Sequence, residues 1–157
     1  MLIQFHQYIT LENIYLWSNF GILPFWLILL VIPNSKVTQF FLNSIIIPLI
    51  ITCAYSYIVY QSFLLENSLI DLFKIYLSIE NLYTAFATES FLLIFWLHFL
   101  ALNIFLGSWI SLDGVKYNIP RGVVALPLIL VYLTGPLGLV LYWLIRVFYA
   151  KKIGFHN

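Results

Sequence analysis

The chain has 157 residues, of which 63% are hydrophobic and 8% are charged, and its mean hydropathy is +1.00. Soluble domains carry about 25% charged residues, so a chain this apolar could not cover a soluble surface without exposing large apolar patches. The net charge of +1 lacks the basic excess of a nucleic-acid-binding protein, and Cys53, the only cysteine, excludes an intrachain disulfide. The composition predicts an all-α, polytopic protein with membrane lipid as its surroundings, forming one membrane domain over residues 1–157.

The first predicted span covers about residues 14–32. Residues 1–13 contain no Lys or Arg, so the basic region of a signal peptide is missing and the first apolar run is expected to be retained. Nineteen residues at 1.5 Å per residue nearly cross a hydrocarbon core of about 30 Å. Pro24 lies inside this run and favours a kink.

The second predicted span covers about residues 41–60. Between it and the next span lies the connection 61–88, in which polar and apolar residues recur at spacings of three and four on separate faces. This periodicity is typical of an amphipathic helix. We therefore expect an interfacial helix between spans two and three.

The third predicted span, about residues 91–110, carries the two polar residues that lie deepest in an apolar run. His98 and Asn103 both fall near its midpoint, where polar side chains mark functional sites by default. They are five residues apart, so they should diverge by about 140° around a straight helix. His98 could exchange a proton near neutral pH or donate an interhelical hydrogen bond. Asn103 could orient a neighbour or a ligand.

Other residues of this region extend the candidate site. Trp109 shares the helix face of His98, and Glu89, at the expected N-terminus, shares that of Asn103. A carboxylate at a helix N-terminus is favourable by about 0.3–1 kcal/mol. After the span, the apolar pattern ends at Asp113 and Gly114. We expect an interfacial turn that is framed by these two residues and by Pro120 and Arg121.

The fourth predicted span, about residues 122–148, is long and broken. Pro127 and the sequence around Gly135, Pro136 and Gly138 interrupt it. Pro136 leaves the carbonyl of Tyr132 without its helical donor, while the glycines allow a backbone or a ligand to come close. We therefore include Gly135, Pro136 and Gly138 among the candidate ligand-binding residues.

Orientation follows from the loop charges. Four spans place both termini on one side, together with four positive charges against three on the other. The positive-inside rule then predicts termini in the cytoplasm or stroma, for a protein of a bacterial inner membrane or a plastid-type membrane.

The sequence contains none of the motifs HExxH, CxxC, GxxxxGK[ST] or GxSxG. A bis-histidine haem would need two histidines at matched depth, but His6 and His156 lie at the ends of the chain. We therefore expect a site without metal and without cofactor.

Three motifs resemble the abscisic-acid-deficient-four-like family: HFLALNIFLGSWISLDG, then IPR, then TGPLGLVLY. This family comprises small membrane proteins related to the plant plastid factor required to make neoxanthin from violaxanthin. The resemblance covers roughly residues 14–148, and the matching positions are His98, Asp113, Gly114, Pro136 and Gly138. The chain departs from the family pattern at Asn103, where an aspartate is usual, and at Ser108, where an arginine is common.

The resemblance implies a carotenoid-like ligand and either binding of it or an isomerase-type reaction on a xanthophyll epoxide. Opening an epoxide and removing a proton to form an allene needs an acid and a base but no net redox change. His98 would be the acid or base, with Asp113 as a second catalytic candidate. Two alternatives stay open: a non-enzymatic scaffold or assembly factor, and a small transporter-like homo-oligomer suggested by the broken fourth span.

Overall fold

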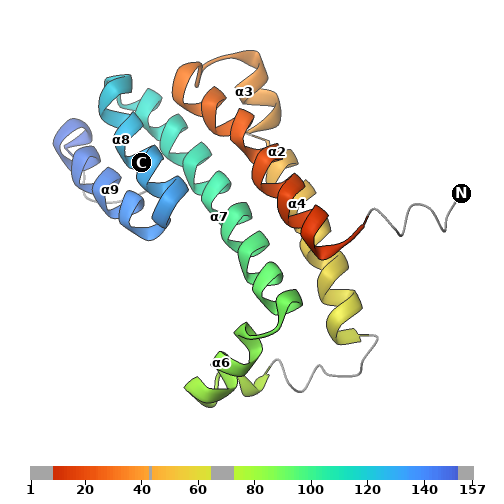
Figure 1. Ribbon diagram of the computed structural model, residues 1–157. Helices are drawn as coiled ribbons and strands as arrows, with labels where there is room; N and C mark the ends of the chain where they lie inside the picture. Colours follow the sequence, from red (N-terminus) through yellow and green to blue (C-terminus); the bar gives the residue numbers. More distant parts are fainter. Residues whose placement is uncertain (1–8, 43, 65–72, 152–157) are drawn as a thin grey trace, which may run out of the picture. The chain divides into compact units, whose positions relative to one another are not determined.

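The computed structural model describes residues 9–42, 44–64 and 73–151, and these contain helices but no strand (Figure 1). In chain order the α-helices are α2 (Leu11–Val31), α3 (Lys36–Phe41), α4 (Ile46–Val59), α6 (Ile79–Phe86), α7 (Glu89–Lys116), α8 (Arg121–Thr134) and α9 (Pro136–Ala150). A π-helical turn, Tyr60–Leu64, extends α4. The expected all-α class is confirmed.

Three of these helical segments are long and apolar enough to cross a membrane: Leu11–Val31, Ile46–Phe63 and Glu89–Lys116. They contain 21, 18 and 28 residues, which at 1.5 Å per residue correspond to about 27 Å or more. A hydrocarbon core is about 30 Å thick. The first three predicted spans therefore correspond to helices of suitable length.

The predicted fourth span is not one helix. Residues 121–150 form two helices, α8 with 14 residues and α9 with 15, separated by Gly135 at φ 64° and ψ −92°. Gly135 adopts this conformation readily because it has no Cβ. Pro136, the first residue of α9, has no N–H with which to continue the hydrogen-bond pattern of α8. The chain therefore reverses, and α8 and α9 lie side by side as an antiparallel hairpin (Figure 1).

The third predicted span was too short. Helix α7 begins at Glu89, as expected, but continues to Lys116, so Asp113 and Gly114 lie within the helix. The turn lies within the expected interval, but it begins after Lys116 and not at these two residues. A single glycine costs a helix only about 1 kcal/mol, and Gly114 is packed closely against Val124 of α8. The chain turns instead at residues 117–120.

The connection between α4 and α7 contains the short helix α6. Ser78 caps its N-terminus by accepting a hydrogen bond from the backbone N–H of Asn81 at 3.1 Å. No residue of α6 is buried, and Ile79 and Tyr83 are 84% and 77% exposed. Residues 65–72 of the predicted interfacial helix lie outside the described part of the chain.

The chain divides into two compact units. The first unit comprises residues Met1–Phe20 and Leu49–Ala101, and the second comprises Gly21–Pro48 and Leu102–Asn157. In the second unit, three hydrogen bonds fix the ends of its helices: Ser108 Oγ to Leu42 O at 2.7 Å, Thr38 Oγ1 to Ile32 O at 2.7 Å, and Arg121 Nη1 to Val31 O at 3.4 Å. The last of these links the N-terminus of α8 to the C-terminus of α2.

Candidate functional site

The second unit contains a buried ion pair between α7 and α9. Arg146 Nε donates a hydrogen bond to Asp113 Oδ2 at 2.6 Å, and the two side chains are 0% and 8% exposed. Removing two charges from a polar solvent costs several kcal/mol per ion unless they are paired and further hydrogen-bonded. These two residues satisfy that requirement through each other and through two tyrosines.

Tyr142 donates its hydroxyl to the same Asp113 Oδ2 at 2.8 Å, and Arg146 Nη2 donates to the hydroxyl of Tyr117 at 3.2 Å. The guanidinium carbon also lies 4.8 Å from the centre of the Tyr117 ring. Tyr117 directly follows α7, and its backbone N–H donates to the carbonyl of Asp113 at 3.1 Å. Tyr142 and Arg146 are four residues apart on α9, so they share one helix face. We name these four residues the ion-pair cluster.

Trp109, a predicted ligand-binding residue, lies beside the ion-pair cluster. Its ring is 5.7 Å from that of Tyr142 in an edge-to-face arrangement with an interplanar angle of 84°. Such aromatic pairs contribute about 0.5–1.5 kcal/mol beyond the burial of their area. Of the predicted site residues, the structure therefore brings Asp113 and Trp109 together around Tyr142.

Two buried donors elsewhere in the second unit have no acceptor. Asn103 is 6% exposed and Trp26 is 4% exposed, and neither Asn103 Nδ2 nor Trp26 Nε1 has a hydrogen-bond partner among the described residues. Leaving a buried donor unsatisfied costs about 1–3 kcal/mol. Since most buried polar atoms in folded proteins are paired, each exception calls for an explanation. We name Asn103 and Trp26 the unpaired donors.

The unpaired donors occupy neighbouring positions on facing helices. A Cβ atom added to Gly107 would lie 2.7 Å from Cη2 of Trp26, so the indole of α2 rests directly on α7 at Gly107. Asn103 is four residues before Gly107, which places it on the same face and about 6 Å along the axis. Tyr132 of α8 contacts Trp26 edge-to-face, with ring centres 5.4 Å apart. The indole of Trp26 therefore packs against the backbone of α7 and the ring of Tyr132.

His98 belongs to the first unit and is exposed on α7. Its ring centre is 6.3 Å from that of Tyr55 on α4. The prediction that His98 and Asn103 occupy different faces is confirmed, because Asn103 is buried and His98 is not. Asp113 follows His98 by fifteen residues on the same helix, about 22 Å along its axis, so the structure does not bring the two catalytic candidates together.

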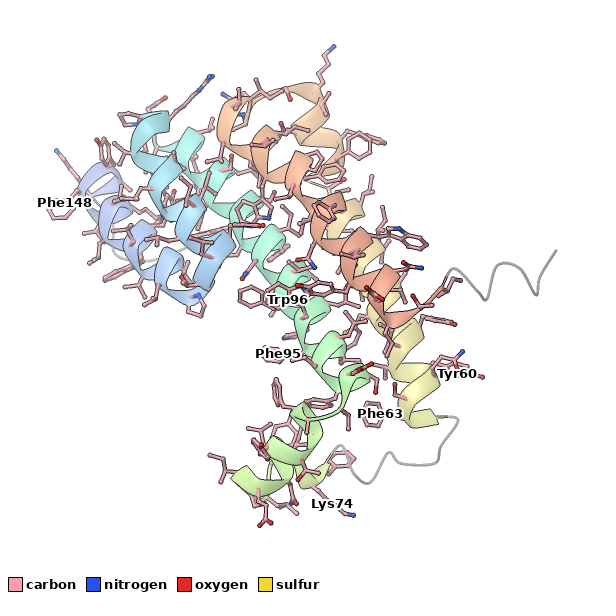
Figure 2. All side chains as sticks on the ribbon, in the orientation of Figure 1. Tyr60, Phe63, Lys74, Phe95, Trp96 and Phe148 are labelled. Carbon is pink, nitrogen blue, oxygen red and sulfur yellow. The ribbon has the colours of Figure 1, made fainter. Side chains whose placement is uncertain are left out.

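Glu89 lines an open groove in the first unit. The groove has a volume of about 510 Å³ and is lined by Leu11, Glu12, Tyr15, Glu89, Leu92, Leu93 and Trp96. Trp96, labelled in Figure 2, donates its indole N–H to Asn19 Oδ1 at 3.1 Å. Because Glu89 is exposed, its carboxylate is available to solvent or to a polar group at the helix N-terminus.

Gly135, Pro136 and Gly138 build the hairpin. A Cβ added to Gly138 would overlap the backbone nitrogen of Val131 and lie 2.6 Å from the carbonyl oxygen of Pro127. The space beside Gly138 is therefore filled by the backbone of α8. Gly135 and Pro136 form the turn that allows α9 to pack this closely against α8.

Three residues of the ion-pair cluster were not predicted from the sequence. The sequence analysis singled out none of Arg146, Tyr117 and Tyr142 as a site residue. Two signals were present: Asp113 is the only acidic residue in residues 90–157, and Arg146 is the only charged residue in residues 122–150. A lone carboxylate and a lone guanidinium in apolar helices are each stable only when paired, and this requirement favours a pair between them.

Comparison with known proteins places most of the chain in a family. A family model described as ABA DEFICIENT 4-like matches residues 13–142. Neither the comparison with curated proteins nor that with solved structures found a match. The matched range includes the unpaired donors, Asp113 and Tyr142, and ends before Arg146.

Proposed function

The chain belongs to the ABA DEFICIENT 4-like family, and on this basis we propose that it is an integral membrane protein that binds an oxygenated, carotenoid-like lipid. Family membership together with the apolar helices fits a membrane protein. One observation supports the proposed class of ligand. The buried N–H donors of Asn103 and Trp26 have no acceptor among the described residues, and Trp26 lies against the ring of Tyr132.

The unpaired donors suit a ligand oxygen. Asn103 Nδ2 and Trp26 Nε1 are both N–H groups, so each would gain an acceptor from a hydroxyl, epoxide or carbonyl oxygen. A site that hydrogen-bonds a ligand oxygen discriminates strongly against an analogue that lacks it, because the buried donors are then left unpaired. A hydroxylated or epoxidised polyene combines such an oxygen with a long apolar body, which suits the surrounding rings of Trp26 and Tyr132.

The other candidate site residues would have separate roles. Trp109 would contribute a ring contact within the second unit, and Glu89 would line the separate groove of the first unit. Gly135, Pro136 and Gly138 would act by shaping the α8–α9 hairpin. We place α6 at the membrane interface, since it has both polar and apolar residues and buries none.

A second candidate function is isomerisation of a carotenoid epoxide, favoured by the ion-pair cluster. In such a reaction a proton is delivered to the epoxide oxygen, the C–O bond breaks to leave a hydroxyl, and a proton is lost from a neighbouring carbon as the allene forms. This reaction is a rearrangement of one molecule, so it needs neither an oxidant nor a reductant. The Tyr142 hydroxyl, hydrogen-bonded to Asp113, is a group that could donate and recover a proton. We therefore prefer Tyr142 and Asp113 to His98 for this role.

Binding is tested by expressing the full chain in a host that makes hydroxylated and epoxidised carotenoids, purifying it in detergent, and recording visible absorbance and lipid mass spectra. We expect an oxygenated carotenoid in the wild type and its loss in Asn103→Leu. The matched control is Thr134→Val, which also replaces a polar residue of the second unit but at an exposed position. A wild-type protein that carries phospholipid alone would contradict the proposal and favour a scaffold or transporter.

Isomerisation is tested in the same host by chromatography of extracted pigments. We expect an allenic product with the wild type, and bound substrate without product with Tyr142→Phe. Wild-type protein that binds pigment but forms no product would reject the reaction and leave the binding proposal standing.

A further inference from the structure

The charged residues of the chain are distributed unevenly along the sequence. The seven cations are Lys36, Lys74, Lys116, Arg121, Arg146, Lys151 and Lys152, and the six acids are Glu12, Glu66, Asp71, Glu80, Glu89 and Asp113. Apart from Lys74, every cation follows or ends the first or the third candidate span. Whether the cations near the C-terminus share a side with the cations that precede the α8–α9 hairpin depends on whether this hairpin crosses the membrane.

Both ends of the hairpin lie at the C-terminal end of α7. Helix α8 begins at Arg121, directly after the turn that follows Lys116, and Arg121 is hydrogen-bonded to the C-terminal residue of α2, Val31. Helix α9 ends at Ala150, and near this end Arg146 is bonded to Asp113 in the last turn of α7 and to Tyr117, which directly follows α7. The C-terminal end of α9 therefore lies beside the C-terminal end of α7, close to where α8 begins.

Neither helix of the hairpin is long enough to cross the membrane. With 14 and 15 residues, α8 and α9 are about 21 and 22 Å long at 1.5 Å per residue, against a core of about 30 Å. Around the turn, Leu133 is 62% exposed and Leu137 is 64% exposed. The exposed Thr134 donates its hydroxyl to the carbonyl of Leu130 within α8 at 2.8 Å. A turn that reached water would normally be polar, whereas one that ends in hydrocarbon needs an apolar surface of this kind.

We propose that α8 and α9 form a re-entrant hairpin, which enters and leaves the membrane on one side and ends at Gly135 within it. The chain then has three crossings, so its N- and C-termini lie on opposite sides. The C-terminus shares its side with Lys36, Lys116 and Arg121. This arrangement differs from the four-span topology predicted from the sequence, which places both termini together.

The charge distribution fixes the orientation of this topology. Among the described residues, this topology places five cations on the C-terminal side, where the only described acid is Asp113, bonded to Arg146. It places Lys74 on the N-terminal side, together with the described acids Glu12, Glu80 and Glu89. The positive-inside rule, which distinguishes the two sides of the four-span topology by one charge, then places the C-terminus in the cytoplasm or stroma and the N-terminus on the opposite side.

The same topology creates a surface for anionic lipid. Lys36, Lys116, Arg121 and Lys151 are all exposed and all belong to the C-terminal side. Basic residues next to a membrane are attracted to an anionic leaflet by about 1 kcal/mol each. The exposed apolar side chain of Phe148, 80% exposed and pointing outward from α9 (Figure 2), adds an interfacial anchor close to Lys151.

The topology is tested with the full chain in a bacterial inner membrane. One set of fusions carries green fluorescent protein or alkaline phosphatase at the C-terminus, which are active only in the cytoplasm and only in the periplasm, respectively. A set of cysteine variants replaces Cys53 with alanine and introduces Asn34→Cys or Thr84→Cys, two exposed positions on either side of α4. These are labelled in intact cells with a maleimide that cannot cross the inner membrane, and again after lysis.

We expect fluorescence and no phosphatase activity at the C-terminus, labelling of Thr84→Cys in intact cells, and labelling of Asn34→Cys only after lysis. A C-terminus on the side of Thr84→Cys would overturn the re-entrant hairpin. Labelling of Asn34→Cys but not Thr84→Cys in intact cells would overturn the orientation. Neither outcome depends on a bound carotenoid, so the topology and the proposed function can fail separately.

Discussion

The side chain of Arg146, near the end of α9, donates a hydrogen bond to the carboxylate of Asp113, near the end of α7, over 2.6 Å. The two residues are 33 positions apart in the sequence, and most of the α8–α9 hairpin lies between them. Their bond therefore closes the hairpin onto the helix from which it departs. It also neutralises two charges that would be costly if buried singly.

We predict that Arg146→Met destabilises the protein by about 3–5 kcal/mol, because it leaves the Asp113 carboxylate buried without its cation. The double variant Asp113→Leu with Arg146→Met should recover most of this loss, since both charges are then gone. Unfolding by heat or denaturant in detergent measures both effects. Additive losses in the double variant would show that the two residues are not energetically coupled.

Gly138→Ala should destabilise the hairpin by about 1–3 kcal/mol, the usual cost of overpacking. The new methyl group would overlap the backbone of α8 at Val131, which cannot move aside as a flexible side chain can. Gly122→Ala is the matched control, because a Cβ at that position of α8 would meet nothing within 4 Å. Equal unfolding midpoints for the two variants would contradict the close packing of α8 and α9.

Asn103→Leu should stabilise the ligand-free protein, by about 1–3 kcal/mol at most, because it removes a buried donor without an acceptor. The same variant should lose bound pigment under the proposed function. Asn103→Asp restores the residue that is usual in the family but replaces the N–H donor with an acceptor, so it should lower pigment binding too. Thermal unfolding of pigment-free protein, with pigment content measured in parallel, checks both expectations. Unchanged pigment content in Asn103→Leu would exclude Asn103 from the site.

His98→Ala should change stability by no more than about 0.5 kcal/mol, the usual range for exposed positions away from special features. If the ion-pair cluster supplies the proton, this variant also retains formation of the allenic product, whereas Tyr142→Phe loses it. Product chromatography in a carotenoid-producing host separates the two assignments. Loss of product in His98→Ala with normal pigment binding would return the acid–base role to His98.

Much of the fold could be predicted from residue type and periodicity. The apolar composition predicted a helical membrane protein, because a helix that spans a membrane satisfies its own backbone hydrogen bonds. The lengths of the apolar runs located three helices that can cross a membrane. The helical repeat alone placed His98 and Asn103 on different faces. The interruption at Gly135 and Pro136 was also visible, since these residues disfavour a continuous helix wherever they occur.

Residue type and periodicity predicted only part of the candidate site. Asp113, Asn103 and Trp109 stood out as polar or aromatic residues in an apolar stretch, but their partners did not. Trp26 packs against Gly107, which is 81 positions later in the sequence, and local spacing carries no signal for a contact of that range. The sequence likewise could not reveal that the amide of Asn103 and the indole of Trp26 lack acceptors among the residues that the structure describes.

The sequence by itself therefore determined that this protein is helical, apolar and interrupted near residue 135. Only the tertiary structure decided that the interruption is a reversal, that α9 returns to α7, and that Asp113 meets Arg146. The physical reason is that a glycine–proline break permits either a kink or a turn with similar local geometry. Long-range terms, namely the pairing of two buried charges and the close packing at Gly138, select between them.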